Sequence, residues 1–428
     1  MTTDRTPHPA PARPAPLTVE ESRLDERLHP GGPALADEVL RRSGFDDLAA
    51  DLAGRIGTAT SLAGLTEAVR EAGTTLWTSA VDRAQGRLVL GGLDPYDDRP
   101  LYWARTTLSA RLRRLESPLL TTQHQRYGLL RLLDLTSRGI DRPAPGPGPD
   151  GRGSATRWWP DARPGDVRVM VSGFDVFGLD DSVRHSNPSG AAALQLDGVR
   201  LTTPFGDVLV RSVVLPVLYG AFDQGVVEDA FGPVLAPGDD RADLIMTISM
   251  TARGRMDVEK WAANARGGTP DNARDQHFGP VSRASHWPQP YDSPDWIETT
   301  LPYAEMVAAG TGPWPVVLKS GIREWPAGTD FDPATLVAAP DPSPGSTAAA
   351  GTGGDYLSNE SMYRSNRLRQ GLHAWEVPGG HLHISALAHP ADPALVTDLA
   401  FETDRRAVVD QTLALVRAAA TAVAGRRG

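Results

Sequence analysis

Ser358 and two histidines are the side chains whose types and spacing are best suited to chemistry. Ser358 lies in Gly-Gly-Asp-Tyr-Leu-Ser-Asn (353–359), in a chain without cysteine. A serine at a strand-to-helix turn can act as a nucleophile, because backbone N–H groups there can hold an oxyanion, but the position is also typical of a helix cap. His381 and His383 form an H-x-H pair of the kind that binds metals. No third ligand at a telling spacing joins them, so we expect no metal site.

Two phenylalanines follow the first apolar run after residue 166. This run, Val-Arg-Val-Met-Val (167–171), is ended by Gly173 and predicts a buried strand. Phe174 and Phe177 come after it, at the carboxyl edge of a parallel sheet, where such folds place their ligands. They can therefore line a pocket. The alternative is a loop whose phenylalanine side chains only pack.

The elements that must position these residues alternate between strand and helix patterns. From residue 166 onward we expect strands at 167–171, 199–203, 207–214, 244–249, 316–319 and 383–387, and helices at 188–196, 222–231 and 406–423. This alternation predicts an α/β/α sandwich with a mainly parallel sheet covered on both faces.

The remaining organisation follows from composition and periodicity. Apolar residues at helical spacing predict an all-helical N-terminal domain over 34–140. The segment before it, 1–33, is rich in Pro, Ala and charge and is expected to be a disordered tail. A Pro/Gly-rich linker is expected at 141–165. The α/β domain then covers 166–424, with a Pro/Gly/Ser-rich insertion at about 323–354.

The composition limits the classes of function. The chain has 428 residues, 40% hydrophobic and 22% charged, which is typical of soluble globular domains. A formal net charge of −10 argues against a general nucleic-acid binder. No apolar run reaches the roughly 20 residues that span a bilayer, and no secretory signal opens the chain. We therefore expect a cytoplasmic protein without membrane or nucleic-acid partners and without a cofactor.

Four ordered blocks resemble the pyroglutamyl peptidase I (pyrrolidone-carboxylate peptidase) family, which uses a Glu–Cys–His set. The blocks are Gly-Phe-Asp-Val-Phe-Gly (173–178) followed by Asn187-Pro-Ser, Val-Glu-Lys-Trp-Ala-Ala-Asn (258–264), Tyr-Leu-Ser-Asn (356–359) and His-Leu-His-Ile (381–384). The resemblance covers about residues 166 to 423 and leaves the helical part unexplained. It implies the pyrrolidone-carboxylate-peptidase-like form of the sandwich.

The resemblance also implies catalytic roles. Ser358 stands where the family has its cysteine nucleophile. His383 would be the general base that activates the nucleophile and the acid that protonates the leaving amine. Glu259 would orient His383 and stabilise the charged imidazole.

The same resemblance assigns the substrate pocket. Phe174 and Phe177 would hold a five-membered lactam ring between them. Asn187 would support the loop or donate a hydrogen bond to the lactam. The substrate class implied is a peptide or small amide that begins with a pyroglutamyl or similar small cyclic residue.

Two departures from the family bear on activity. A serine hydroxyl is far less acidic than a thiol of pKa about 8.5 and depends more on its base. Ser358 is therefore either a working nucleophile, the mark of an inactive homologue, or the replacement of a natural cysteine. The family's arginine before Pro-Asp-Asn is also missing here, and whether Arg266 replaces it is open.

The leading hypothesis is therefore a peptidase or amidase of the pyroglutamyl peptidase type. One alternative is a non-catalytic binding or scaffold protein that keeps the pocket without turnover. Another is a tailoring amide hydrolase or acyl transferase that acts on a larger peptide or metabolite. Self-association through the helical domain also stays open.

Overall fold

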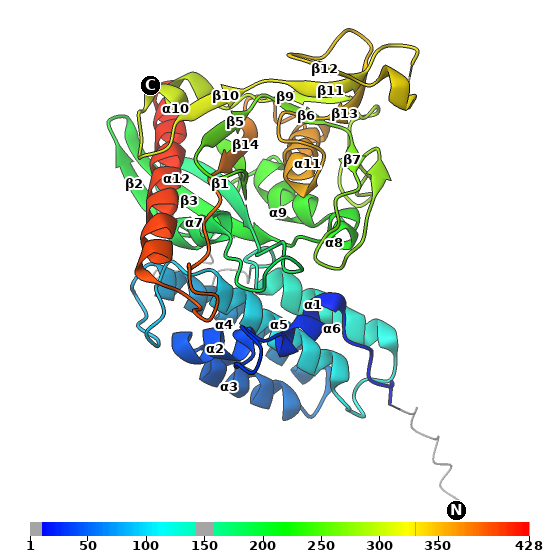
Figure 1. Cartoon of the computed structure of the whole chain (residues 1–428), viewed down its shortest axis with the longest axis vertical. Helices are drawn as coiled ribbons and strands as arrows, with labels where there is room; N and C mark the ends of the chain where they lie inside the picture. Colours follow the sequence, from blue (N-terminus) through cyan, green and yellow to red (C-terminus); the bar gives the residue numbers. More distant parts are fainter. Residues whose placement is uncertain (1–10, 143–157, 330, 428) are drawn as a thin grey trace, which may run out of the picture.

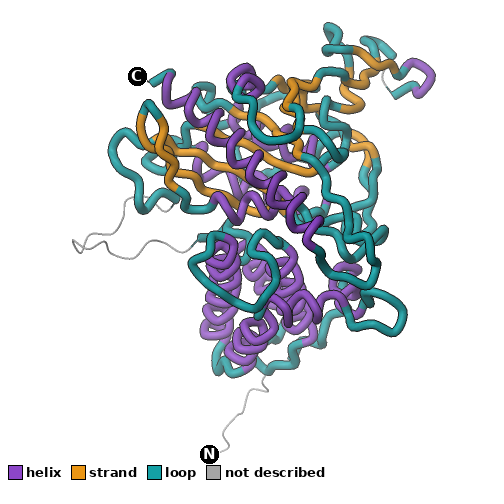
Figure 2. Tube along the Cα trace, turned by 60° about the vertical axis from the view of Figure 1, so that its left-hand side comes forward, coloured by secondary structure: helices purple, strands orange, loops and turns teal. Residues whose placement is uncertain are grey.

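A helical N-terminal region is followed by a mixed α/β region built on a seven-stranded, mostly parallel sheet. The structure, a computed structural model, describes residues 11–142, 158–329 and 331–427. The helices gather on one side of the α/β region, next to the loops that leave its strands (Figures 1 and 2). The expected order, helices first and an α/β sheet second, is confirmed.

The helical region encloses one apolar core. Phe45 of α3, Leu76 of α4 and Trp103 of α5 are all fully or almost fully buried in it. The hydroxyl oxygen of Ser61 accepts a hydrogen bond from the backbone N–H of Gly64 and caps the long α4, and a Thr122–Gln125 capping box begins α6. The elements are α1 (Val19–Ser22), η1 (Arg23–Asp25), α2 (Leu35–Ser43), α3 (Phe45–Gly57), α4 (Leu62–Ala84), α5 (Arg99–Arg114) and α6 (Gln123–Thr136).

Residues 11–33 differ from the disordered tail expected over 1–33. Thr18 caps α1 in a capping box with Glu21. The buried Arg23 donates a hydrogen bond of 2.6 Å to the main-chain oxygen of Asn272 in the α/β region. Composition misled the prediction, because a Pro-rich segment can be held by a few buried polar side chains. Residues 1–10 lie outside the described residues.

The sheet runs in the order β10-β5-β14-β4-β1-β3-β2. All neighbours pair in parallel except β14 with β5 and β3 with β2. The short strand β5 was not expected from the sequence, because its four residues, Met-Asp-Val-Glu, contain no continuous apolar run of the kind that marks β10. The strands are β1 (Val167–Phe174), β2 (Arg200–Thr203), β3 (Gly206–Leu215), β4 (Leu244–Met250), β5 (Met256–Glu259), β10 (Val316–Lys319) and β14 (Gly379–Ile384).

Helices cover both faces of the sheet. One core lies between the sheet and α9 with α11, and another lies between the sheet and α12. The expected helix at 188–196 is confirmed, and the one expected at 222–231 is two helices, α8 and α9, separated at Gly225. The helices are α7 (Pro188–Leu196), α8 (Tyr219–Asp223), α9 (Val226–Leu235), α10 (Tyr303–Ala308), α11 (Leu357–Gly371) and α12 (Leu399–Gly425).

The helix α12 is long and apolar enough to cross a membrane, judged by length and composition. Of its most apolar window, 56% is buried inside the fold, where it packs on the sheet. A buried core helix can have the same length and apolar composition as a membrane-spanning helix, so α12 is only weak evidence for a membrane span among the described residues.

The insertion expected at about 323–354 contains strands. It forms a small antiparallel sheet in the order β12-β11-β13, which projects from the α/β region (Figure 1). Its last strand leads directly into the Ser358 segment. Most of the expected linker, 143–157, lies outside the described residues. The elements of the insertion are β11 (Ile322–Trp325), η2 (Pro333–Thr335), β12 (Val337–Ala339) and β13 (Thr347–Ala350). Two small antiparallel pairs lie elsewhere in the α/β region. They are β6 (Trp261–Ala263) with β9 (Trp296–Glu298), and β7 (Arg266–Gly267) with β8 (Phe278–Gly279).

Candidate active site

A buried histidine–carboxylate pair lies where β14 and β5 run side by side. Nδ1 of His383 lies 2.5 Å from Oε1 of Glu259, and the two side chains are 4% and 1% exposed. A carboxylate on Nδ1 fixes the ring orientation and leaves Nε2 as the nitrogen that can exchange a proton. Nε2 forms no hydrogen bond with the part of the chain that the structure describes. The arrangement is that of an oriented general base.

The electrostatics of the pair keep the carboxylate charged. Burial alone would raise the pKa of Glu259, but the charge and hydrogen bond of the nearby His383 lower it. The ammonium of Lys319, 3.6 Å from Oε1, acts in the same direction. The pKa of Glu259 therefore lies below its ordinary value, and a carboxylate in this state can stabilise a charged imidazole.

The neighbouring His381 has a structural role. Its Nδ1 lies 2.7 Å from the hydroxyl of Thr247, and its Nε2 lies 2.8 Å from the hydroxyl of Ser249. Complete burial, with the charges of His383 and Lys319, places the pKa of His381 well below its ordinary value. Both ring nitrogens are thus occupied by hydroxyls. Within the described ranges no group of three or more His, Cys, Asp or Glu side chains is arranged to hold a metal.

Ser358 is the second residue of α11 and is partly buried. The first amide groups of a helix have no acceptor within the helix, so Ser358 lies beside N–H groups that can stabilise negative charge. Its hydroxyl forms no hydrogen bond with any residue that the structure describes, His383 included. The nucleophile–base contact is therefore not formed in this state.

Ser358 nevertheless lies at the same end of the sheet as the pair. Ser249, the register partner of His383 on β4, lines a small cavity together with Ser358. Five residues before Ser358, a Cβ added to Gly353 would lie 3.1 Å from Cε1 of His383 and 3.5 Å from Cδ of Glu259. The segment 353–358 thus runs from the histidine–carboxylate pair to the candidate nucleophile, and the glycine allows the close approach.

The cavity beside Ser358 brings the predicted pocket residues together. It has a volume of about 40 Å³, and its walls include Phe174, Phe177 and Asn187. Phe174 stacks on Phe222 with 6.2 Å between ring centroids, and Phe177 contacts Tyr356 at 6.4 Å. The two phenylalanines thus form separate walls, each supported by another ring.

The side chain of Asn187 joins the loop after β1 to the start of α7. Its Nδ2 donates to the main-chain oxygen of Asp175 at 2.7 Å, and its Oδ1 accepts from the backbone and hydroxyl of Ser189. As the N-cap residue of α7 it joins the loop after β1 to the following helix.

The helical region holds this loop from the other side. The carboxylate of Asp175 accepts hydrogen bonds of 2.5 and 2.6 Å from Nη2 of Arg105, and another from Arg138. Asp98 accepts from the backbone N–H of Asn187 at 2.9 Å. Sequence reasoning missed these helical residues, because no motif marks them and their partners are 37 to 89 positions away.

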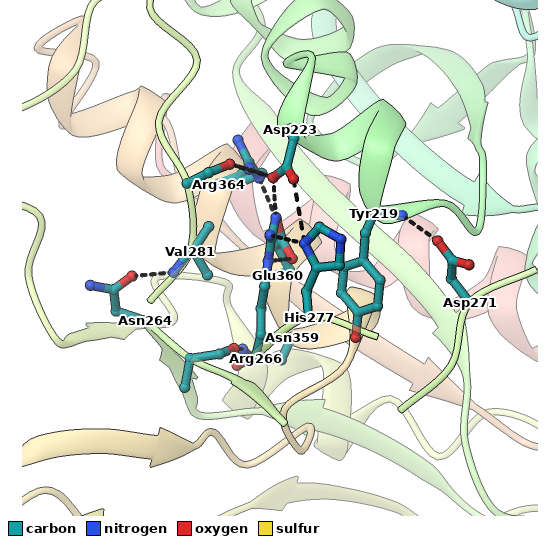
Figure 3. A network of polar contacts seen from close by, with 12 residues as sticks. Tyr219, Asp223, Asn264, Arg266, Asp271, His277, Val281, Asn359, Glu360 and Arg364 are labelled. Carbon is teal, nitrogen blue, oxygen red and sulfur yellow. Dashed lines mark hydrogen bonds and ion pairs between the residues drawn. The ribbon is translucent and has the colours of Figure 1, made fainter. Parts of the chain in front are cut away.

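A buried ionic network fixes the helix that carries Ser358. Arg266 donates to both oxygens of Glu360, at 2.8 and 2.6 Å, and to Asp223 at 2.5 Å (Figure 3). Arg364 donates to Glu360 at 2.6 Å and to Glu228 at 2.9 Å. Arg266 therefore binds the first turns of α11. Its positive charge is balanced by Glu360 and Asp223, so it needs no bound substrate as a partner.

The variant Arg364→Met should strongly destabilise the fold. Arg364, Glu360 and Glu228 have no exposed side-chain surface, so the substitution removes the nearest counter-charge of Glu228 and one of the two arginines that bind Glu360. Removing one partner of a buried pair costs about 3–5 kcal/mol. Urea unfolding measures the loss. Arg41→Met, which breaks an exposed pair with Glu38, is the control and should cost less than about 1 kcal/mol; equal losses would contradict the role given to the network.

Comparison with known proteins covers both regions of the chain. A family model described as the PA0049 N-terminal domain matches residues 3–134, and one described as the PA0049 C-terminal domain matches 168–291 and 322–388. The Uncharacterized protein PA0049 of Pseudomonas aeruginosa is 30% identical, over 96% of this chain and 90% of the relative. The chain belongs to the PA0049 family.

The PA0049 matches include the whole candidate site. Glu259 falls in the first matched part of the C-terminal domain, and Ser358 and His383 fall in the second. Arg105, which holds the loop, falls in the matched N-terminal domain. The residues between the two parts, 292–321, include β9, α10 and β10 and lie outside the match.

Proposed function

We propose that this protein hydrolyses an amide bond that follows an N-terminal pyroglutamyl or similar small cyclic residue. Ser358 is the nucleophile, His383 the general base and acid, and Glu259 the residue that orients His383. The observation that carries the proposal is the buried His383–Glu259 pair, at the same end of the sheet as the serine-lined cavity. The fold is then the pyrrolidone-carboxylate-peptidase-like form of the α/β/α sandwich, which the order of the four sequence blocks along its strands supports.

The chemistry follows from these positions. Nε2 of His383 takes the proton of the Ser358 hydroxyl as the oxygen attacks the amide carbonyl carbon. The N–H groups at the start of α11 stabilise the oxyanion, and Glu259 stabilises the imidazolium. His383 then gives its proton to the leaving amine, and the C–N bond breaks. Water attacks the acyl-enzyme by the same route in reverse and releases the acid.

The small cavity fits the cyclic residue. Its walls combine the rings of Phe174 and Phe177 with the amide of Asn187. A flat lactam gains from aromatic faces and needs few polar partners. At about 40 Å³ the cavity has to widen on binding, and we expect the same movement to bring the hydroxyl to His383. Catalytic hydrogen bonds are often long before the substrate binds.

A second candidate function is a non-catalytic binding protein. The observation in its favour is the Ser358 hydroxyl, which has no hydrogen bond to His383 in the described structure. Such a protein would bind a pyroglutamyl ligand without cleaving it.

The deciding assay follows coumarin release from a pyroglutamyl aminocoumarin amide. We expect release to be at least about tenfold faster than from the prolyl amide, because the prolyl ring lacks the lactam carbonyl and carries a charge. Thermal stabilisation by the pyroglutamyl compound without release would instead support the binding protein. Neither release nor stabilisation would exclude both functions.

A further inference from the structure

A second, larger cavity lies between the helical region and the α/β region. Its volume is about 470 Å³, within the range of small-molecule sites of roughly 300–1,000 Å³. Its walls come from α5 and α6 on one side and from the segments around Leu218 and Asp271 on the other. Neither phenylalanine of the candidate lactam pocket lines it, so the space is separate from that pocket.

An arginine with an unused donor group lines this cavity. Arg105 is 4% exposed, and its Nη2 is bound to Asp175. Its Nη1 is buried and has no hydrogen-bond partner among the described residues. A buried charged donor without a partner costs free energy, so we expect a ligand to accept a hydrogen bond from this Nη1 group. A guanidinium presents its N–H groups in a planar fork that matches a carboxylate.

The cavity is also lined by an acidic side chain, Glu20, that has no basic hydrogen-bond partner among the described residues. Oε1 of Glu20 accepts hydrogen bonds from the Tyr102 hydroxyl at 2.9 Å and from Nδ2 of Asn272 at 3.1 Å. Burial, and then the charge of Asp175, raise the pKa of Glu20 above its ordinary value. A carboxyl in this state gains from a cation placed beside it. The cavity therefore offers one group for a carboxylate and one for an amine.

The two cavities are neighbours along the chain and through contacts. Val217 lines the small cavity and Leu218 the large one. Asn272, bound to Glu20, also donates to the main-chain oxygen of Val176 in the loop between Phe174 and Phe177. Asp175 of the same loop binds Arg105. The loop 174–177 therefore borders both cavities.

We propose that the large cavity binds the leaving amino acid or dipeptide of the substrate, its carboxylate on Arg105 and its newly formed amine on Glu20. The substrates are then short pyroglutamyl peptides with a free C-terminal carboxylate. A doubly charged phosphate ester suits the site less well, because acidic side chains such as Glu20 and Asp271 share the walls with the arginines.

Two measurements test the proposal for the large cavity. Because that proposal rests on the proposed function, the measurements are chosen so that failure of one can be told from failure of the other. The first is calorimetric binding of alanyl-alanine, alanyl-alaninamide and phosphoethanolamine. We expect alanyl-alanine to bind at least about tenfold more tightly than the other two. The second is turnover of pyroglutamyl-alanyl-alanine and of its amide, with the free acid again favoured by about tenfold in kcat/KM.

The outcomes separate the two ideas. Equal binding of the free acid and the amide, or tighter binding of phosphoethanolamine, overturns the cavity assignment. Turnover without preference for the acid also overturns it and leaves the proposed function standing. No turnover, together with acid-selective binding, overturns the proposed function and supports the cavity.

Variants locate the effect. Arg105→Lys keeps the charge beside Asp175 but removes the planar fork, so the preference for the acid should fall to about threefold or less. Arg55→Gln, on an exposed face of α3, should leave it unchanged. Thermal unfolding confirms that each variant is folded, and the acid–amide comparison on the wild-type protein stands even if Arg105→Lys does not fold. An unchanged preference in folded Arg105→Lys overturns the assignment.

Discussion

Ser358→Ala should lower kcat/KM for a pyroglutamyl amide by at least about 10³-fold. Removing the nucleophile of a hydrolase leaves only the contributions of binding and of the oxyanion site. Ser358 is partly buried and its hydroxyl has no hydrogen bond in the described structure, so the substitution costs the fold little. A large loss of rate with unchanged stability is therefore expected, measured by coumarin release and urea unfolding.

Two further variants make the Ser358 experiment decisive. Ser358→Cys introduces a thiol that ionises more easily than a hydroxyl, and the rate should equal or exceed that of the wild-type protein. Ser365→Ala removes a buried hydroxyl two turns further along α11 and should keep the rate within about threefold. Equal rates for the wild-type protein and Ser358→Ala would remove Ser358 from the mechanism.

Glu259→Gln should lower kcat by about 10³–10⁴-fold while leaving KM nearly unchanged. The carboxylate accepts from Nδ1 of His383 at 2.5 Å and keeps the second nitrogen, Nε2, free to take a proton. An amide can instead donate to Nδ1, which favours the wrong tautomer, and it carries no charge to stabilise the imidazolium. A raised KM with unchanged kcat would indicate a role in substrate binding instead.

The control for Glu259 is its neighbour Asp257, which is equally buried on the same strand. Asp257 pairs with Arg255 at 2.8 Å and lies 3.9 Å from Lys319. Asp257→Asn should therefore lower kcat less than about tenfold. Glu259→Asp, which keeps the charge on a shorter side chain, should retain more activity than Glu259→Gln. If Glu259→Gln turned over as fast as the wild-type protein, His383 would not need this carboxylate.

Elements with a strong local pattern could be predicted from the sequence. The helix at 188–196 begins with Asn-Pro-Ser, a capping residue followed by a first-turn proline, and the structure has the same bounds. The strand expected at 244–249 is β4, one residue longer. Its uninterrupted apolar run is typical of a strand that is buried on both faces. In both places local propensity and tertiary packing favour the same structure.

Elements without such a pattern could not be predicted. The strand β5 has four residues and is held by its neighbours β14 and β10. The N-terminal residues 11–33 read as a tail, yet Arg23 is buried against Asn272, 249 positions away. In both segments the stabilising contacts are distant in the chain, so composition and periodicity carry no trace of them.

The amino-acid sequence by itself determined the order of helices and strands and the residue types able to do chemistry, because periodicity, capping and turns depend on near neighbours. Only the tertiary structure decided which of them meet. His383 and Glu259 are 124 positions apart and form a pair because β14 and β5 run side by side. Arg105 reaches Asp175 because the helices pack beside the loops of the sheet. Such contacts depend on how elements pack, which no local pattern encodes.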